Sequence, residues 1–284
     1  MRRLALAVVA TLLALAACEG ALRLHEGTLT FPDDGRRFAT RPGTRGTNSR
    51  GFHDREDVPK GGIAVLGDSM TWGTTTWEEA WPRVAEARVG RPVLNYSHYG
   101  YDAAQSAATL RHHVWGDAPS RIVYAAYAND LVPTRLITVG ELAIPAWLGP
   151  RTALGRAILG AWHVRRPGEA EDVAAFDAAL ADMATQAREH DVPLLVFGLA
   201  PWRLGDLERL RIVEARCAGV PFASVVPYLR GSPGDYAPAN RDDGEHPGPA
   251  GHRLFAAAFA DVLGRWERGE PLPRVDDPPI TMAP

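Results

Sequence analysis

The chain carries a serine, an aspartate and a histidine whose order and spacing suit nucleophilic catalysis. Ser69 follows the apolar run 63–66 across a sharp turn, and Asp243 precedes His246 by three positions. An alcohol is a poor nucleophile at neutral pH, so a serine needs a histidine as its base. By spacing, the Asp243 carboxylate reaches Nδ1–H of His246, which leaves Nε2 able to take a proton from Ser69.

The turn at Ser69 admits other interpretations when it is taken alone. A phosphate-binding P-loop needs a lysine after its second glycine, but Thr74 follows Gly73 here. A hydrolase elbow of the G-x-S-x-G type needs a glycine where Thr71 stands. A serine that merely caps a helix fits the turn equally well. An isolated Asp-x-x-His likewise fits a helix N-terminus with an exposed histidine, so neither motif decides the function by itself.

Short apolar runs alternate with helical patterns from residue 61 onward, which predicts a parallel sheet covered by helices on both faces. The expected strands are 63–66, 92–96, 121–127, 193–198 and 220–223, and the expected helices cover about 77–89, 102–115, 171–190 and 250–264. The fold class is therefore α/β, a three-layer α/β/α sandwich with a five-stranded parallel sheet. Ser69, Gly100 and Asn129 each follow a different strand, so we expect them to converge at its carboxyl edge.

Four segments occur in an order that resembles the GDSL/SGNH hydrolase family. Gly67-Asp68-Ser69 is similar to its first block, and Asn95-Tyr96-Ser97-His98-Tyr99-Gly100 is similar to the second. Asn129-Asp130 resembles the third block, and the segment from Asp243 to His246 resembles the last. The segment 47–52 looks like one that precedes the first block in many exported bacterial members. The resemblance covers about residues 47–262, and the order of all four blocks makes it specific.

The resemblance implies a flavodoxin-like SGNH hydrolase fold and a serine hydrolase that cleaves an ester through an acyl-serine intermediate. It assigns Ser69 as the nucleophile. It also implies an oxyanion hole made by the backbone N–H groups of Ser69 and Gly100 and by the Asn129 amide. Two departures from the family pattern are Ala128, where a glycine is usual, and Met70, where a leucine is usual. Neither departure removes a catalytic group.

The composition fits one large globular domain with appendages. The 284 residues are 46% apolar and 23% charged, and the net charge of −3 gives no support for nucleic acid as a partner. We expect a lead-in over 18–60, a hydrolase domain over 61–265 and a C-terminal tail over 266–284. The segment 131–170 breaks the alternation of strands and helices and is either a lid or a surface excursion. Packing of its apolar residues onto the domain's own core is the favoured interpretation.

Residues 1–17 predict an export signal. Two arginines precede fourteen uncharged residues, fewer than the ~20 that span a bilayer comfortably. Leu15-Ala16-Ala17-Cys18 resembles a lipobox, in which Cys18 is lipidated and becomes the mature N-terminus. An uncleaved anchor and ordinary cleavage after Ala16 are the alternatives, and all three place the domain outside the cytoplasm. Cys217 then has no disulfide partner, and its helical spacing predicts a buried thiol.

No cofactor and no metal are expected. Three histidines have no ligand partners at metal-binding spacing, namely His98, His112 and His113. Asp68 and Asp130 are expected to make turn hydrogen bonds, and His252 to cap or pack. The expected partners are an ester of a small molecule, polysaccharide or lipid, and a membrane through the N-terminus. Acyl transfer to a sugar or alcohol is the alternative chemistry, and a non-catalytic envelope module with the same fold is the alternative from another class.

Overall fold

The computed structural model describes residues 2–26, 29–30, 32, 34, 36, 38–73, 76–131, 172–200, 207–232 and 246–282. Asp243 and nearly all of the segment 131–170 lie outside the described residues. The predicted roles of Asp243 and of that segment therefore stay predictions.

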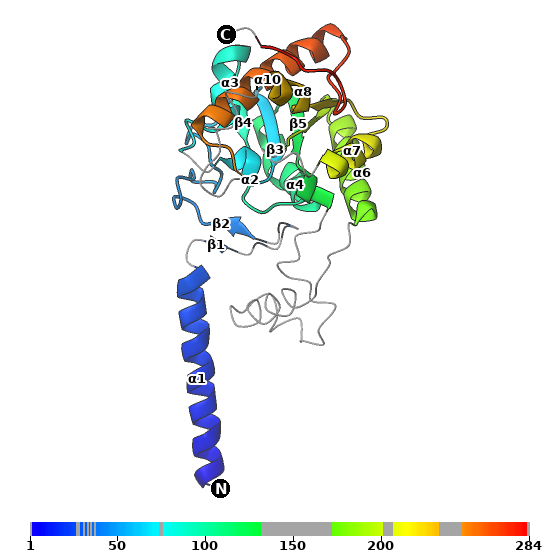
Figure 1. Cartoon of the computed structure of the whole chain (residues 1–284). Coiled ribbons are helices and arrows are strands. Elements are labelled where there is room, and N and C mark those ends of the chain that lie inside the picture. The colour runs from blue at the N-terminus through cyan, green and yellow to red at the C-terminus, as the bar shows by residue number, and fades with distance from the viewer. Residues whose placement is uncertain are drawn as a thin grey trace.

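The domain is built around a five-stranded parallel sheet, as the sequence predicts (Figure 1). Its strands are β3 (Ile63–Gly67), β4 (Val93–Asn95), β5 (Arg121–Ala126), β6 (Leu194–Gly198) and β7 (Phe222–Ser224). They lie in the order β4-β3-β5-β6-β7, which is the flavodoxin-like order. Nearly every strand residue is buried, because a parallel sheet carries helices on both faces.

Helices cover the two faces of the sheet and complete three layers (Figure 1). On one face α3 (Trp81–Val89) packs against α10 (Pro249–Arg268), and on the other α4 (Ala103–Thr109) packs against α6 (Val173–Glu189). The shorter helical segments are α2 (Ser69–Trp72), η1 (Leu110–Val114), η2 (Trp115–Asp117), η3 (Ala128–Leu131), α7 (Leu207–Arg216) and α8 (Val226–Gly231). The predicted helix from about residue 77 begins only at Trp81, where Pro82 occupies the first turn.

The core joins the layers through large aromatic side chains. The fully buried Trp81 ring of α3 lies 5.8 Å from the Phe197 ring of β6 and 5.1 Å from the Phe259 ring of α10. Replacing such a side chain by alanine typically costs about 3–5 kcal/mol. This contact fixes α10 on α3, and both helices begin near the carboxyl edge of the sheet.

The lead-in and the tail are both attached to the domain. The lead-in forms a small antiparallel pair, β1 (Leu29–Thr30) and β2 (Ala39–Thr40), and its Asp54 carboxylate accepts the Asn95 N–H of β4 at 2.8 Å. The tail follows α10. Its Pro273 carbonyl accepts a hydrogen bond from the Ser224 N–H of β7 at 2.7 Å. The tail therefore covers part of the edge strand of the sheet.

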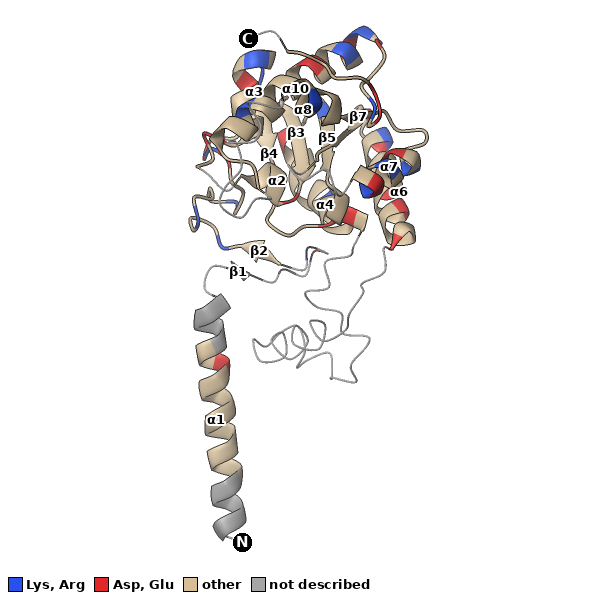
Figure 2. Ribbon diagram, viewed as in Figure 1, with Lys and Arg blue, Asp and Glu red and all other residues tan. Residues whose placement is uncertain are grey.

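The N-terminal helix α1 (Arg2–Glu26) exposes Val8, Leu12 and Leu13. Within the described ranges, we find no helix with the length and apolarity needed to cross a membrane. Charges of both signs are interspersed on α6 and α7 (Figure 2). One pair there, Arg216 with Asp177, links the two helices.

Candidate active site

Ser69 stands at a sharp turn between β3 and α2. Gly67 ends the strand, and a Cβ at that position would lie 2.9 Å from the Ala125 carbonyl oxygen, so only glycine fits the turn. Asp68 caps α2 by accepting the Met70 N–H at 2.9 Å. The cap is thus Asp68, and Ser69 is the first residue of the helix, only 7% exposed.

His246 lies beside Ser69 at the entry to α10. Its Nε2 is 2.9 Å from Oγ of Ser69, a hydrogen-bonding distance that suits proton transfer between a nucleophile and its base. His246 is partly exposed, whereas Ser69 is buried. The predicted pairing of these two residues is therefore present in the structure.

Gly100 and Asn129 follow the two strands that flank β3. Gly100 lies in the loop after β4 at φ 72°, a backbone conformation that favours glycine. The same loop is held to the end of β3 by the His98 N–H, which donates to the Gly67 carbonyl at 3.1 Å. Asn129 lies in η3, directly after β5, and its side chain is exposed.

These positions match the switch point of the sheet, where ligands bind in open α/β folds. The chain leaves β3 toward β4 in one direction and leaves β5 toward β6 in the other. Ser69 follows β3 and Asn129 follows β5, so the crevice between these strands lies between the two residues. Burial raises the pKa of the Asp68 carboxyl, and a hydrogen bond from the Asn129 side chain offsets part of that rise.

Two carboxyl groups are buried beneath this edge. Burial raises the pKa of Asp68 to about 6, and burial together with the Asp68 charge raises the pKa of Asp130 well above its usual range. Asp130 accepts the Tyr127 N–H at 2.8 Å, so the turn roles predicted for both aspartates are confirmed. The Tyr124 hydroxyl lies within hydrogen-bonding reach of the Asp130 carboxyl. Such a cluster favours a protonated acid, since two adjacent buried charges repel each other.

The lead-in supports the loop that carries Gly100, a role that was not predicted from the sequence. The Thr40 hydroxyl donates to Nε2 of His98 at 2.7 Å, while Nδ1–H of His98 donates to the Tyr99 carbonyl at 2.9 Å. Burial lowers the pKa of His98 to about 4, so the ring is neutral at pH 7 in the tautomer that these contacts require. The Tyr101 ring stacks on the His98 ring, with a centroid distance of 4.6 Å and an interplanar angle of 20°.

Tyr99 is a second residue for which no role was predicted from the sequence. Its ring stacks on the His246 ring with a centroid distance of 5.4 Å and an interplanar angle of 26°. The signal available in the sequence was its position directly before Gly100. No periodic pattern distinguishes such a loop aromatic from one that packs inward.

The remaining candidate residues are structural. His252 is fully buried and its Nδ1 accepts the Trp81 N–H at 3.2 Å, so it packs as expected. Cys217 is buried, and burial raises the pKa of its thiol to about 12, which makes it a poor nucleophile. Among the described residues, no three histidine, cysteine or acidic side chains are grouped as metal ligands.

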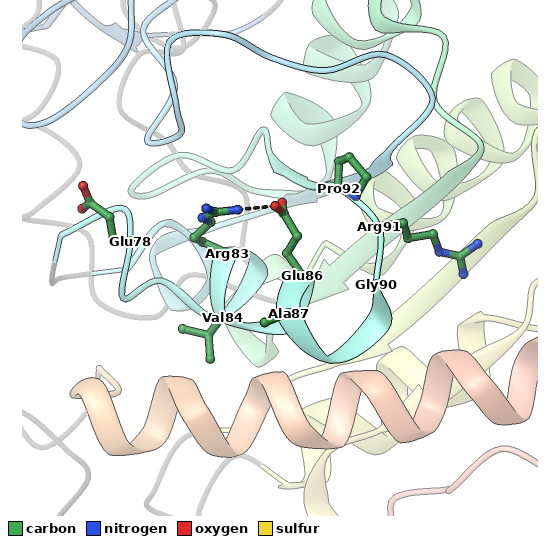
Figure 3. Close-up of a pocket in the computed structure, with 8 residues that line it drawn as sticks. All are labelled: Glu78, Arg83, Val84, Glu86, Ala87, Gly90, Arg91 and Pro92. Carbon is green, nitrogen blue, oxygen red and sulfur yellow. Dashed lines mark hydrogen bonds and ion pairs between the residues drawn. The ribbon is translucent and has the colours of Figure 1, made fainter.

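A separate surface hollow lies along α3 and the turn that follows it (Figure 3). Its lining includes Arg83, Glu86 and Arg91, and the first two form an ion pair. None of the predicted catalytic residues lines it. The side chains that line it include charged groups but no pair that could act as nucleophile and base.

No protein-family model matches the chain, and no curated protein does. Solved structures do match. A GDSL-like lipase from Bacteroides thetaiotaomicron is 17% identical over 72% of this chain and 88% of its own, with a TM-score of 0.45. A lipase/acylhydrolase from Enterococcus faecalis is 18% identical over 72% of this chain and 96% of its own, with a TM-score of 0.47. The first of these proteins carries the name of the family that the four sequence blocks resemble.

Proposed function

We propose that the protein is a serine hydrolase that cleaves an ester through an acyl-serine intermediate. The observation that carries the proposal is the hydrogen bond between Nε2 of His246 and Oγ of Ser69 at the switch point of a parallel sheet. A buried serine at a strand–helix turn, paired with a histidine, is the arrangement that nucleophilic catalysis requires. A serine that only capped a helix would not need this partner.

In the proposed reaction, His246 takes the Ser69 proton as Oγ attacks the acyl carbon. The carbonyl oxygen becomes negative and receives hydrogen bonds from the N–H groups of Ser69 and Gly100 and from the Asn129 amide. The imidazolium then gives its proton to the departing alcohol, which leaves the acyl group on Ser69. Water, activated by His246, cleaves this acyl-serine and restores the free enzyme. Asp243 is proposed to hold the His246 ring in the required tautomer.

The same proposal places the protein outside the cytoplasm, tethered through a lipid on Cys18. The lipobox-like segment before Cys18 supports it, and the Cys18 side chain is exposed on α1.

The test of the proposed function is ester hydrolysis by Ser69→Ala, His246→Ala and the double variant. We expect each single variant to lose nearly all activity toward p-nitrophenyl esters while keeping a melting temperature close to that of the wild type. The double variant should be little worse than either single one, because the two side chains act as one unit. Substantial activity in Ser69→Ala would exclude Ser69 as the nucleophile, and product analysis with added alcohols would reveal transfer in place of hydrolysis.

A further inference from the structure

Tyr99 is unusually exposed for a large side chain in this domain. It is 44% exposed, and among the described residues the other exposed large apolar side chains all belong to α1. Burial of an aromatic ring is favourable, so a partly exposed ring beside the Ser69–His246 pair suggests that a bound molecule covers its exposed part.

The contact with His246 fixes where this ring lies. The two rings are nearly parallel, at 26°, but their centroids are 5.4 Å apart, so they are offset and overlap only in part. Tyr99 keeps 44% of its surface exposed despite this contact. Tyr99 also directly precedes Gly100, so one loop carries both this ring and a proposed oxyanion donor.

The proposed chemistry decides which part of an ester meets the ring. His246 must hand its proton to the departing alkoxide, whose oxygen therefore lies about 2.6–3.2 Å from Nε2 during acylation. The alcohol then lies on the His246 side of Ser69, where Tyr99 is. The acyl chain extends from the carbonyl carbon on Ser69 and has no such requirement to approach the imidazole.

We propose that Tyr99 binds the alcohol portion of the substrate and that this alcohol is a sugar ring. A pyranose offers a flat face of C–H groups that an aromatic ring covers, while its hydroxyl groups stay in water. A linear alkyl alcohol has no such face. This inference rests on the proposed function and narrows its substrate to an acylated carbohydrate.

The experiment compares two esters of one acyl group, chosen as the best among p-nitrophenyl esters of graded chain length. One ester is made with ethanol and the other with a methyl glucoside, and kcat/KM is measured for each with the full chain. We expect Tyr99→Ala to lower the ratio of sugar ester to ethyl ester roughly three- to tenfold, the range expected for one stacked ring. Tyr99→Phe, which keeps the ring, should retain the ratio within about twofold.

His190→Ala is the matched control. It also removes a stacked ring, the partner of Trp115 at 3.8 Å, but this pair lies at the C-terminal end of α6 and on η2. It should leave the ratio unchanged. Equal losses of kcat/KM on both esters in Tyr99→Ala leave their ratio unchanged. This result would show that the ring only supports His246 and would overturn the inference. A change in acyl-chain preference alone would also overturn it. Ser69→Ala separates the two proposals: activity retained on both esters refutes the function itself, whereas its loss leaves the Tyr99 result to decide the substrate.

Discussion

Nε2 of His246 lies 2.9 Å from Oγ of Ser69, although 177 positions separate the two residues in the sequence. Ser69 is placed by β3, and His246 is placed by the entry to α10. The two elements are joined through α3, whose first residue donates its N–H to His252 of α10. The distance between Ser69 and His246 therefore depends on how α10 packs on α3, and His252 adds a hydrogen bond to that packing.

We expect His252→Leu to destabilise the fold and to lower turnover. The change removes the acceptor for the Trp81 N–H, and leaving a buried donor unsatisfied costs about 1–3 kcal/mol. The loss should fall near 1 kcal/mol, because Nε2–H of His252 has no hydrogen-bond partner among the described residues and is removed too. Chemical denaturation and kcat per folded molecule measure the two effects. His252→Gln, which restores an acceptor, is the control, and equal losses in both variants would refute the capping role.

The sequence predicted the sheet well because buried parallel strands are short, continuous apolar runs. The strand at 63–66 was placed to within one residue, and Ser69, Gly100 and Asn129 were each placed after a strand. The pairing of Ser69 with His246 was predicted from residue type and spacing together with the resemblance to the hydrolase family. The helix after Ser69 was predicted less well, since a short α2 closes at Gly73, where φ is 83°, before α3 begins.

What the sequence did not reveal are contacts between distant segments that have no periodicity. Thr40 and His98 are 58 positions apart, and neither stands in a pattern that pairs them. The burial of Asp68 and Asp130 was also missed, although their turn hydrogen bonds were expected. The sequence next to an aspartate does not indicate whether its side chain is exposed or buried. In this domain the packing of β5 and η3 determines the burial.

The lipid proposal predicts that membrane association depends on Cys18. Wild-type protein should fractionate with membranes, and Cys18→Ser should lose that association. Cys217→Ala is the control, because this thiol is buried and should not affect fractionation. Equal membrane association of wild type and Cys18→Ser would favour an uncleaved anchor instead.

Asn129 should act in the transition state and not in substrate binding. Its amide is proposed to donate to the oxyanion, a bond that strengthens only as the carbonyl oxygen becomes charged. Asn129→Ala should lower kcat and kcat/KM together by about 10²–10³, with KM little changed. Because the residue is exposed, the fold should survive the change, and loss of the Asn129 hydrogen bond to the Asp68 carboxyl should lower the free energy of unfolding by about 1 kcal/mol. A stable Asn129→Ala variant with unaltered kcat would refute the oxyanion role. Asn129→Asp keeps the shape of the side chain without the donor, so its kinetics should resemble those of the alanine variant.

The buried carboxyl pair predicts a specific pH dependence of stability. Asp130 faces Asp68, Tyr124 and Asp102, and Asp68 faces Asn129, His246 and Asp130. Both aspartates have a folded pKa above the unfolded value of about 3.9. Their contribution to stability is therefore complete below pH ~4 and is lost as the pH rises through the folded pKa of each group. For Asp68 this folded pKa is about 6.

Asp130→Asn should weaken this loss of stability, because the amide resembles the protonated acid and cannot ionise. It also removes the charge that repels Asp68. Between pH 5 and 8 the unfolding free energy of the wild type should fall relative to that of the variant, by at most about 1.4 kcal/mol per pH unit for each titrating group. Urea denaturation at several pH values measures this difference, and Asp177→Asn on the surface of α6 should reproduce the wild-type slope. If the free energy of unfolding depends on pH in the same way in wild type and Asp130→Asn, Asp130 is already ionised in the folded protein. The prediction of a protonated, buried Asp130 would then be wrong.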